Sequence, residues 1–283
     1  MPEPIAVLDA LLGGRLRIER QLGRGAMGTV YLAHDRKHDR RVALKVLAPE
    51  LARSLGTRRF HREISIAARL SHPHIAPLHE SGQAGAFLYY TMPFIEGGSL
   101  RDRLNAGPLP VAEALGLGIE VADALGYAHG RGIVHRDVKP ENILLPGGHA
   151  VIVDFGIARA ISAASTEEPI TETGLIVGTA SYVSPEQAAG EALDGRSDLY
   201  SLGCVVYEML AGDPPYGGAS TQAVIARHLA APVPDLCIMR PEAPPSLAAV
   251  LRRALAKAPG DRFSTAGEMA ESLREVLSAA ALH

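Results

Sequence analysis

The chain has 283 residues, of which 47% are hydrophobic and 21% are charged, a composition typical of a soluble globular protein with a substantial core. This length allows one large domain or two units of ordinary size and excludes a single small module. The 28 Lys and Arg residues and 31 Asp and Glu residues give a net charge of −3, so the chain lacks the basic excess that drives nucleic-acid binding.

Cysteine content and hydropathy exclude further classes of protein. Cys204 and Cys237 are the only cysteines. They are too few for a disulfide framework or a four-thiolate metal site, and they predict reduced thiols in a cytosolic protein. No apolar run reaches the about 20 residues that a membrane helix needs. The first 14 residues contain Glu3 and Asp9 and lack the basic start of a secretory signal.

The first third of the chain predicts an antiparallel sheet, because it contains several short runs of β-branched and aromatic residues. These runs are residues 16–20, 29–32, 42–47 and 87–90. One helix is expected among them over residues 57–70, with Phe60, Ile64 and Ala67 on one face and Pro73 just beyond its end.

After Gly97 and Gly98 the hydrophobic pattern becomes helical. One apolar stripe runs from residue 111 to residue 125, and the helix that carries it is expected to end near Gly130. Residues 199–210 are apolar nearly all round, which predicts a helix in the centre of a core. Thr265 and Glu268 fit a capping box at the start of a last helix, and residues 162–173 predict an exposed, mobile loop.

Residues 23–28 read Gly-Arg-Gly-Ala-Met-Gly, a pattern that by itself is often an ordinary turn. A dinucleotide-binding loop would be followed by a helix. Here Thr29, Val30 and Tyr31 continue as a strand, so the glycines predict a hairpin. A glycine-rich hairpin lets backbone N–H groups approach phosphates without a Cβ in the way.

Lys45 lies in an apolar strand after this hairpin, where a charged group is costly unless it is paired. The alternative is an edge-strand lysine whose ammonium reaches solvent. Glu63, on the helix that follows, offers a carboxylate for pairing, although a single helical Glu is more often solvated. The order of these groups after the glycine loop favours a phosphate-binding lysine.

Residues 135–142, His-Arg-Asp-Val-Lys-Pro-Glu-Asn, place a carboxylate, a cation and an amide in one short loop. Phosphoryl transfer from ATP to a hydroxyl needs a carboxylate that accepts the proton, a cation near the phosphate and oxygen ligands for Mg²⁺. Asp137, Lys139 and Asn142 supply these groups in that order. Asp154, in an Asp-Phe-Gly sequence after the apolar run 151–153, adds a second oxygen ligand, although such a sequence alone is often a turn.

Together these motifs resemble the Hanks-type protein kinases. The resemblance covers residues 15–276 and is strongest to the eukaryotic-like serine/threonine kinases of bacteria, particularly in residues 178–187. It rests on residues 22–30, 42–45, Glu63, 135–142, 154–156 and 184–186. It implies an α+β, bilobal fold, with an extension over 1–14 and a kinase domain over 15–283. That domain comprises an N-lobe of antiparallel sheet and one helix (15–92), a hinge (93–98) and a mainly helical C-lobe (99–279).

The resemblance also implies the roles of individual residues. Asp137 would deprotonate the acceptor, Lys139 would offset charge on the transferred group, Lys45 held by Glu63 would position the phosphates, and Thr179 would shape the acceptor site. Mg²⁺ or Mn²⁺ would bind to Asn142 and Asp154. Adenine would be held by the carbonyl of Pro93 and the N–H of Ile95, and Met92 would be the gatekeeper residue. The full set implied for ATP binding is Leu22, Gly23, Gly25, Gly28, Val30, Ala43, Lys45, Met92, Pro93, Ile95, Asn142 and Asp154.

Further expectations follow from the same resemblance. Lys139, two residues after Asp137, is the serine/threonine form and implies Ser and Thr acceptors on proteins. Asp198 would anchor the backbone of the catalytic loop, and Glu186 would pair with Arg262. Because Arg136 can pair with a phosphorylated residue, the candidates for autophosphorylation are Thr171 and Thr173.

The expected partners are protein substrates and a second copy of the chain for trans-autophosphorylation, without nucleic acid. The expected location is cytoplasmic, either for this chain alone or for the cytosolic part of a longer membrane-anchored kinase. Two alternative functions remain: a pseudokinase scaffold that binds without catalysis, and a small-molecule phosphotransferase. The first is disfavoured because no catalytic position is replaced. The second is disfavoured because such enzymes lack the segment 178–186.

Overall fold

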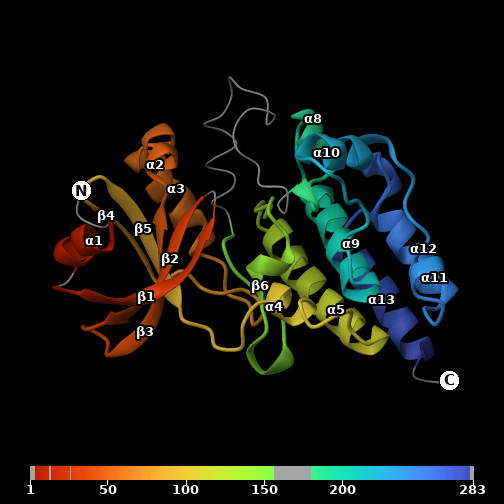
Figure 1. Ribbon diagram of the computed structural model, residues 1–283, viewed down its shortest axis with the longest axis horizontal. Coiled ribbons are helices and arrows are strands. Elements are labelled where there is room, and N and C mark those ends of the chain that lie inside the picture. The colour runs from red at the N-terminus through yellow and green to blue at the C-terminus, as the bar shows by residue number, and fades with distance from the viewer. Residues whose placement is uncertain (1–3, 13, 26, 156–179, 281–283) are drawn as a thin grey trace. The chain divides into compact units, whose positions relative to one another are not determined.

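The computed structural model describes residues 4–12, 14–25, 27–155 and 180–280 (Figure 1). Within them the chain forms two compact units. The first unit contains residues up to 71 together with 76–96, and the second contains 72–75, 97–155 and 180–280. Thr171, Thr173, Thr179 and the predicted loop over residues 162–173 lie outside the described residues.

The first unit is built on a five-stranded antiparallel sheet with strand order β1-β2-β3-β5-β4. The predicted strands and the predicted helix are confirmed. Two helices, α1 and α2, and one strand, β4, are additional to the prediction. The elements are α1 (Pro4–Leu12), β1 (Leu16–Gly25), β2 (Gly28–Asp35), β3 (Arg40–Leu47), α2 (Pro49–Leu55), α3 (Thr57–Ala67), β4 (Glu80–Ala84) and β5 (Phe87–Pro93).

One core cluster of the first unit lies between one face of this sheet and α1, which packs against β1 and β4 (Figure 1). Leu8 and Leu12 of α1 belong to the same buried cluster as Tyr31, Leu44 and further sheet residues. The residues predicted as an N-terminal extension therefore contribute a helix to the core. Burial of their leucine side chains stabilises the unit by about 1.5–3 kcal/mol each.

The second unit is mainly helical, with a two-stranded sheet of β6 and β7. Its α-helices are α4 (Leu100–Leu104), α5 (Val111–His129), α8 (Pro185–Ala189), α9 (Gly195–Ala211), α10 (Thr221–Ala230), α11 (Leu236–Met239), α12 (Pro245–Ala254) and α13 (Ala266–Ala280). Its short elements are η1 (Pro140–Asn142), β6 (Ile143–Leu144), η2 (Pro146–Gly148), β7 (Val151–Ile152) and η3 (Pro259–Asp261). Among the residues described, no helix is both long enough and apolar enough to span a bilayer.

The centre of the second unit is α9, which packs against α5, α12 and α13 (Figure 1). Every residue of α9 from Ser197 to Leu210 is buried, as the apolar sequence over residues 199–210 predicts. The helix begins where the Asp194 side chain accepts a hydrogen bond from the Arg196 N–H, and it ends at Gly212 in the left-handed conformation. These signals fix the ends of the helix to which the loop of residues 135–142 is anchored.

The predicted capping box at the start of α13 is half confirmed. The backbone N–H of Glu268 donates to the Thr265 hydroxyl at 3.1 Å. The Glu268 carboxylate, however, accepts from the backbone N–H of Ser264 at 2.8 Å, one residue earlier than a capping box requires. The Glu268 side chain also pairs with Arg253 of α12, and this pairing draws it away from the position expected from the sequence.

Candidate active site residues

The predicted glycine hairpin is present in the first unit. β1 and β2 pair in antiparallel register to their ends, where Gly25 faces Gly28. Gly28 has φ of 145°, and a Cβ at this position would lie 2.1 Å from the carbonyl oxygen of Val46. Only glycine fits there, because the backbone of β3 approaches too closely and the conformation is one that L side chains rarely adopt.

The register of the sheet places several predicted nucleotide-binding side chains on one face. Val30 lies opposite Lys45, and Ala43 lies opposite Met92. Residues directly opposite in a sheet share a face, as do residues two apart on one strand. The other face of β3 carries Leu44 and the core cluster under α1. Val30, Ala43, Lys45 and Met92 are therefore brought together on the face of the sheet opposite the α1 core.

Lys45 and Glu63 are both buried, with 7% and 8% of their surfaces exposed. Glu63 lies on α3 among the buried residues Phe60 and Ile64, so its carboxylate is on the apolar side of the helix. A charged group in such an environment is stable only when it is paired or hydrogen-bonded. The burial of both groups fits the predicted pairing of Lys45 with Glu63, which remains a prediction.

The two hinge residues implied for adenine, Pro93 and Ile95, lie at and just beyond the end of β5, and both are partly buried.

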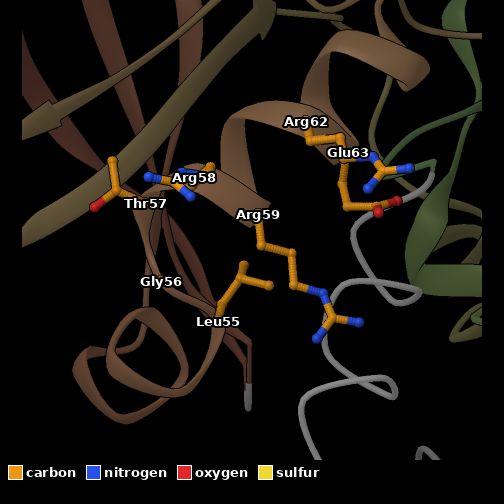
Figure 2. A pocket seen from close by; sticks show the side chains of 7 residues that line it. All are labelled: Leu55, Gly56, Thr57, Arg58, Arg59, Arg62 and Glu63. Carbon is orange, nitrogen blue, oxygen red and sulfur yellow. The ribbon is translucent and has the colours of Figure 1, made fainter.

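A pocket of about 690 Å³ opens where α2 meets α3. Arg58, Arg59 and Arg62 line it together with Glu63. Figure 2 shows Arg62 and Glu63 extending to one side of α3, while Thr57 and Arg58 lie on the other side. The wall of this pocket is thus mainly cationic, and its one carboxylate is the buried Glu63.

In the second unit the structure brings Asp137, Lys139 and Asn142 together. The Lys139 ammonium lies 2.8 Å from Oδ2 of Asp137. The Asn142 amide donates to the same carboxylate oxygen at 2.9 Å and to the backbone carbonyl of Asp137 at 2.8 Å. The carboxylate is thus held by two donors that approach one of its oxygens, and its other oxygen, Oδ1, receives no hydrogen bond from the described residues.

The backbone of this loop is anchored by Asp198, as the resemblance implies. The buried Asp198 carboxylate accepts the backbone N–H of His135 at 2.8 Å and that of Arg136 at 2.7 Å. It also contacts His129 Nε2 at 2.7 Å. Gly195 is required beside this contact, because a Cβ at Gly195 would lie 2.6 Å from the His129 ring. A single carboxylate from α9 thus orients the two residues that precede Asp137.

The fully buried ring of His135 connects the loop to the segment that carries Asp154. Its Nδ1 accepts the backbone N–H of Asp137 at 3.2 Å, its Nε2 lies 3.0 Å from the carbonyl oxygen of Val153, and its edge meets the ring of Phe155. The sequence alone did not single out this ring. Because the ring contacts both Asp137 and the segment from Val153 to Phe155, it fixes the loop and this segment relative to each other.

Asp154 follows β7 with a positive φ of 68°, which is uncommon for a residue other than glycine. Pairing of β6 with β7 brings its neighbour Val153 to Asn142, since the Val153 N–H donates to the Asn142 carbonyl at 2.9 Å. Asn142 and Asp154 therefore lie at the same end of the small sheet. Unusual backbone conformations of this kind concentrate at functional sites.

The donor set at this end of the sheet fits a hard divalent cation. The Asn142 amide nitrogen is fully engaged with Asp137, so its amide oxygen is turned away from that residue. Amide and carboxylate oxygens are the protein ligands that Mg²⁺ takes, usually few in number because water and phosphate supply the rest. The described residues contain no group of three or more His, Cys, Asp or Glu side chains that could hold a metal ion.

The predicted pair of Glu186 and Arg262 is confirmed. Both residues are buried, and two hydrogen bonds of 2.7 Å join the guanidinium to the carboxylate. Burial raises the pKa of Glu186, but the hydrogen bonds from Arg262 and Ser197 together lower it by more than burial raises it. The net pKa therefore lies below its usual value. The carboxylate therefore stays ionised and keeps the start of α8 attached to the segment before α13.

Two other contacts with the loop were not expected from the sequence. The Gln187 amide donates to the carbonyl of Arg136 at 2.8 Å, and Arg101 of α4 contacts Glu141 at 2.8 Å. Neither residue stands out in the sequence, because Gln187 also fits the capping box of α8 and Arg101 sits in an ordinary amphipathic turn. Only the folded chain places them beside residues 135–142.

An antiparallel sheet unit, a helical unit, a glycine hairpin and an anchored Asp-Lys-Asn loop define a protein kinase domain. The family model described as protein kinase domain matches residues 16–274, and the chain belongs to this family. The predicted α+β kinase fold is thereby confirmed. Protein kinases use ATP and a divalent metal ion.

Several relatives are serine/threonine-protein kinases. PknJ of Mycobacterium tuberculosis is 44% identical over 269 residues, which cover 92% of this chain and 45% of that protein. PknB of Mycolicibacterium smegmatis is 43% identical over 273 residues, which cover 94% of this chain and 43% of that protein. The chain thus spans under half the length of these relatives. The crystal structure of the Mycobacterium tuberculosis PknI kinase domain is similar with a TM-score of 0.71 and 35% identity, over 92% of this chain and 96% of that one.

Proposed function

We propose that this chain is an active serine/threonine protein kinase domain, which transfers the γ-phosphoryl group of ATP to Ser and Thr hydroxyls of proteins. The observation that carries the proposal is the arrangement around Asp137: Lys139 and Asn142 both bind one of its carboxylate oxygens at 2.8 and 2.9 Å. A carboxylate held in this way can orient an acceptor hydroxyl and take its proton, while the neighbouring ammonium offsets charge on the migrating phosphoryl group.

The remaining roles belong to the same proposal. Lys45, held by Glu63, binds the phosphates of ATP. Asn142 and Asp154 would hold Mg²⁺ or Mn²⁺, which would supply charge neutralisation at the phosphates. The nucleotide itself is bound by the glycine hairpin, the sheet face that carries Val30, Ala43 and Met92, and the backbone around Pro93 and Ile95. Thr179 contributes to the acceptor site.

Protein hydroxyls are the proposed acceptors because Lys139 stands two residues after Asp137 and the relatives carry serine/threonine kinase names. We also propose autophosphorylation at Thr171 or Thr173, between two copies of the chain, with Arg136 as the cation that pairs with the new phosphate. The proposed location of the domain is cytoplasmic. The proposed hinge, residues 93–98, separates an N-lobe (15–92) from a C-lobe (99–279).

The test compares the wild-type protein with Asp137→Asn and Arg103→Ala. Each is incubated with Mg²⁺ and γ-labelled ATP, with a generic protein substrate in one set and small hydroxyl compounds in another. We expect label on protein Ser and Thr with wild-type protein and Arg103→Ala, and a loss of at least about 1,000-fold with Asp137→Asn.

Other outcomes would contradict the proposal. Label on small compounds alone identifies a small-molecule phosphotransferase, and no label on either set, from folded protein that still binds ATP, identifies a pseudokinase. Mass spectrometry of the labelled protein tests autophosphorylation separately, because absence of phosphate from Thr171 and Thr173 would overturn that part of the proposal.

A further inference from the structure

Arg101 lies between two acidic side chains, Glu141 and Glu208, beside the loop of residues 135–142. Its Nε donates to Glu141 Oε1 at 2.8 Å, one of its terminal nitrogens donates to Glu208 Oε1 at 2.6 Å, and the other donates to the hydroxyl of Tyr182. The Tyr182 hydroxyl donates in turn to the Glu208 carboxylate. One guanidinium from α4 therefore connects the end of the loop, the segment before α8 and the central helix α9.

The charges in this cluster do not cancel. Two carboxylates face one guanidinium, and the side chain of Glu208 is only 3% exposed while that of Glu141 is 43% exposed. Burial lowers the pKa of Arg101, but the hydrogen bonds to Glu208 and Glu141 together raise it by more than burial lowers it. The net pKa therefore lies above its ordinary value. Without Arg101 the two acids would form a partly exposed site with a strong demand for a cation.

The position of Glu141 places this site within reach of an acceptor peptide. Glu141 follows Asp137 by four residues, so their Cα atoms lie at most about 15 Å apart, and the 3₁₀ turn of η1 shortens the path. An extended peptide advances about 3.3 Å per residue. A side chain within four residues of the hydroxyl that Asp137 deprotonates can therefore approach the two carboxylates.

We propose that Arg101 is a specificity-determining residue. It fills the acidic site formed by Glu141 and Glu208, so this site cannot bind a basic side chain of an acceptor peptide. The kinase therefore shows no preference for peptides with an Arg at the position that would reach this site. The proposal rests on the proposed kinase function and adds to it the class of substrate. A guanidinium already bound in two charge-assisted contacts excludes a second one by space and by repulsion.

The test measures kcat/KM for a set of Thr peptides that carry a single Arg at each position from −4 to +4. The wild-type protein is compared with Arg101→Ala and with Arg103→Ala, the matched control. Arg103 lies on the same helix, and its one ion pair within the described residues is with the exposed Glu113. We expect less than about threefold variation across the peptides for the wild type and the control, and a gain of at least about tenfold at one or two positions for Arg101→Ala. No gain at any position, or a wild-type preference for Arg that survives in Arg101→Ala, would overturn the proposal.

A second variant protects the test against misfolding, because loss of Arg101 leaves the buried Glu208 uncompensated. Glu141→Gln keeps the contact between Arg101 and Glu208. We expect its peptide profile to be as flat as that of the wild type, and we expect Arg101→Ala combined with Glu141→Gln to lose the gain. A change in Arg preference on Glu141→Gln alone would show that Glu141 already reads the substrate, and would overturn the proposal even if Arg101→Ala does not fold.

Peptide binding separates this proposal from the kinase assignment. Fluorescence anisotropy with a labelled Arg peptide, without ATP, should show at least about tenfold tighter binding to Arg101→Ala than to the wild type. If this difference appears but no protein transfers phosphate, the kinase function fails and the role of Arg101 stands. If the wild type phosphorylates peptides and the difference is absent from both binding and kcat/KM, the role of Arg101 fails and the kinase function stands.

Discussion

Arg262 and Glu186 form a two-pronged ion pair inside the second unit, with both nitrogen-to-oxygen distances at 2.7 Å. The guanidinium also donates to the backbone carbonyls of Ala256, Lys257 and Arg196. Because every donor is satisfied away from water, the pair fixes how three segments of the chain meet.

Loss of this pair should destabilise the protein strongly. We expect Arg262→Ala to lower the free energy of unfolding by about 3–5 kcal/mol, because it leaves the buried Glu186 without a counter-charge. The control is Arg274→Ala, which breaks an exposed pair with Asp123 and should cost less than about 1 kcal/mol. Denaturant unfolding measures both variants, and similar losses in the two would contradict the assigned role of burial.

Asp198 should act on turnover through the loop that it anchors. We expect Asp198→Asn to lower kcat at least about tenfold while leaving the KM for ATP close to that of the wild type. The N–H groups of His135 and Arg136 donate to different oxygens of the carboxylate, and an amide replaces one of these oxygens with an NH₂ group that cannot accept. Steady-state kinetics check this split, with the exposed Asp213→Asn as control. An unchanged kcat would show that the loop holds its geometry without Asp198.

Gly28 should be intolerant of any side chain. Gly28→Ala places a Cβ 2.1 Å from the carbonyl oxygen of Val46 and should lower stability by about 1–3 kcal/mol. Gly23→Ala in the same hairpin meets no atom within 4 Å and should stay within about 0.5 kcal/mol of the wild type. Thermal unfolding of the two variants decides whether close approach of β3, rather than glycine content alone, limits the hairpin.

His228 should make stability depend on pH. Its ring is fully buried beside Tyr200 and Tyr216, and burial, assisted by the charge of Lys257, lowers its pKa from 6.5 to about 4. The unfolded chain therefore binds the proton more readily between these two values, so stability is retained above about pH 6.5 and is lost as the pH falls toward 4.

The size of this effect can be measured by difference. Between pH 7.5 and pH 5, wild-type protein should lose about 2 kcal/mol more unfolding free energy than His228→Gln. His149→Gln, which changes an exposed histidine, should follow the wild type. Parallel pH curves for the wild type and His228→Gln would refute the assignment.

The agreement between sequence and fold differs from element to element for physical reasons. β2, β3 and β5 could be predicted because their β-branched and aromatic residues favour strands locally. β4, with the sequence Glu-Ser-Gly-Gln-Ala, has no such preference and forms because its backbone pairs with β5. The sequence predicts only an extension where α1 forms, because a short apolar stretch is helical only once it can pack, here against the sheet.

The amino-acid sequence by itself determined which chemical groups this protein carries and in what order, because residues 135–142 hold a carboxylate, an ammonium and an amide within eight positions. It also determined the partners that family resemblance implies, including Glu186 with Arg262. Only the tertiary structure decided that Arg101 meets Glu208, 107 positions later, beside Glu141. Ion pairs and hydrogen bonds act over a few ångströms, so contacts between distant residues exist only after helices and strands have packed and brought those residues together.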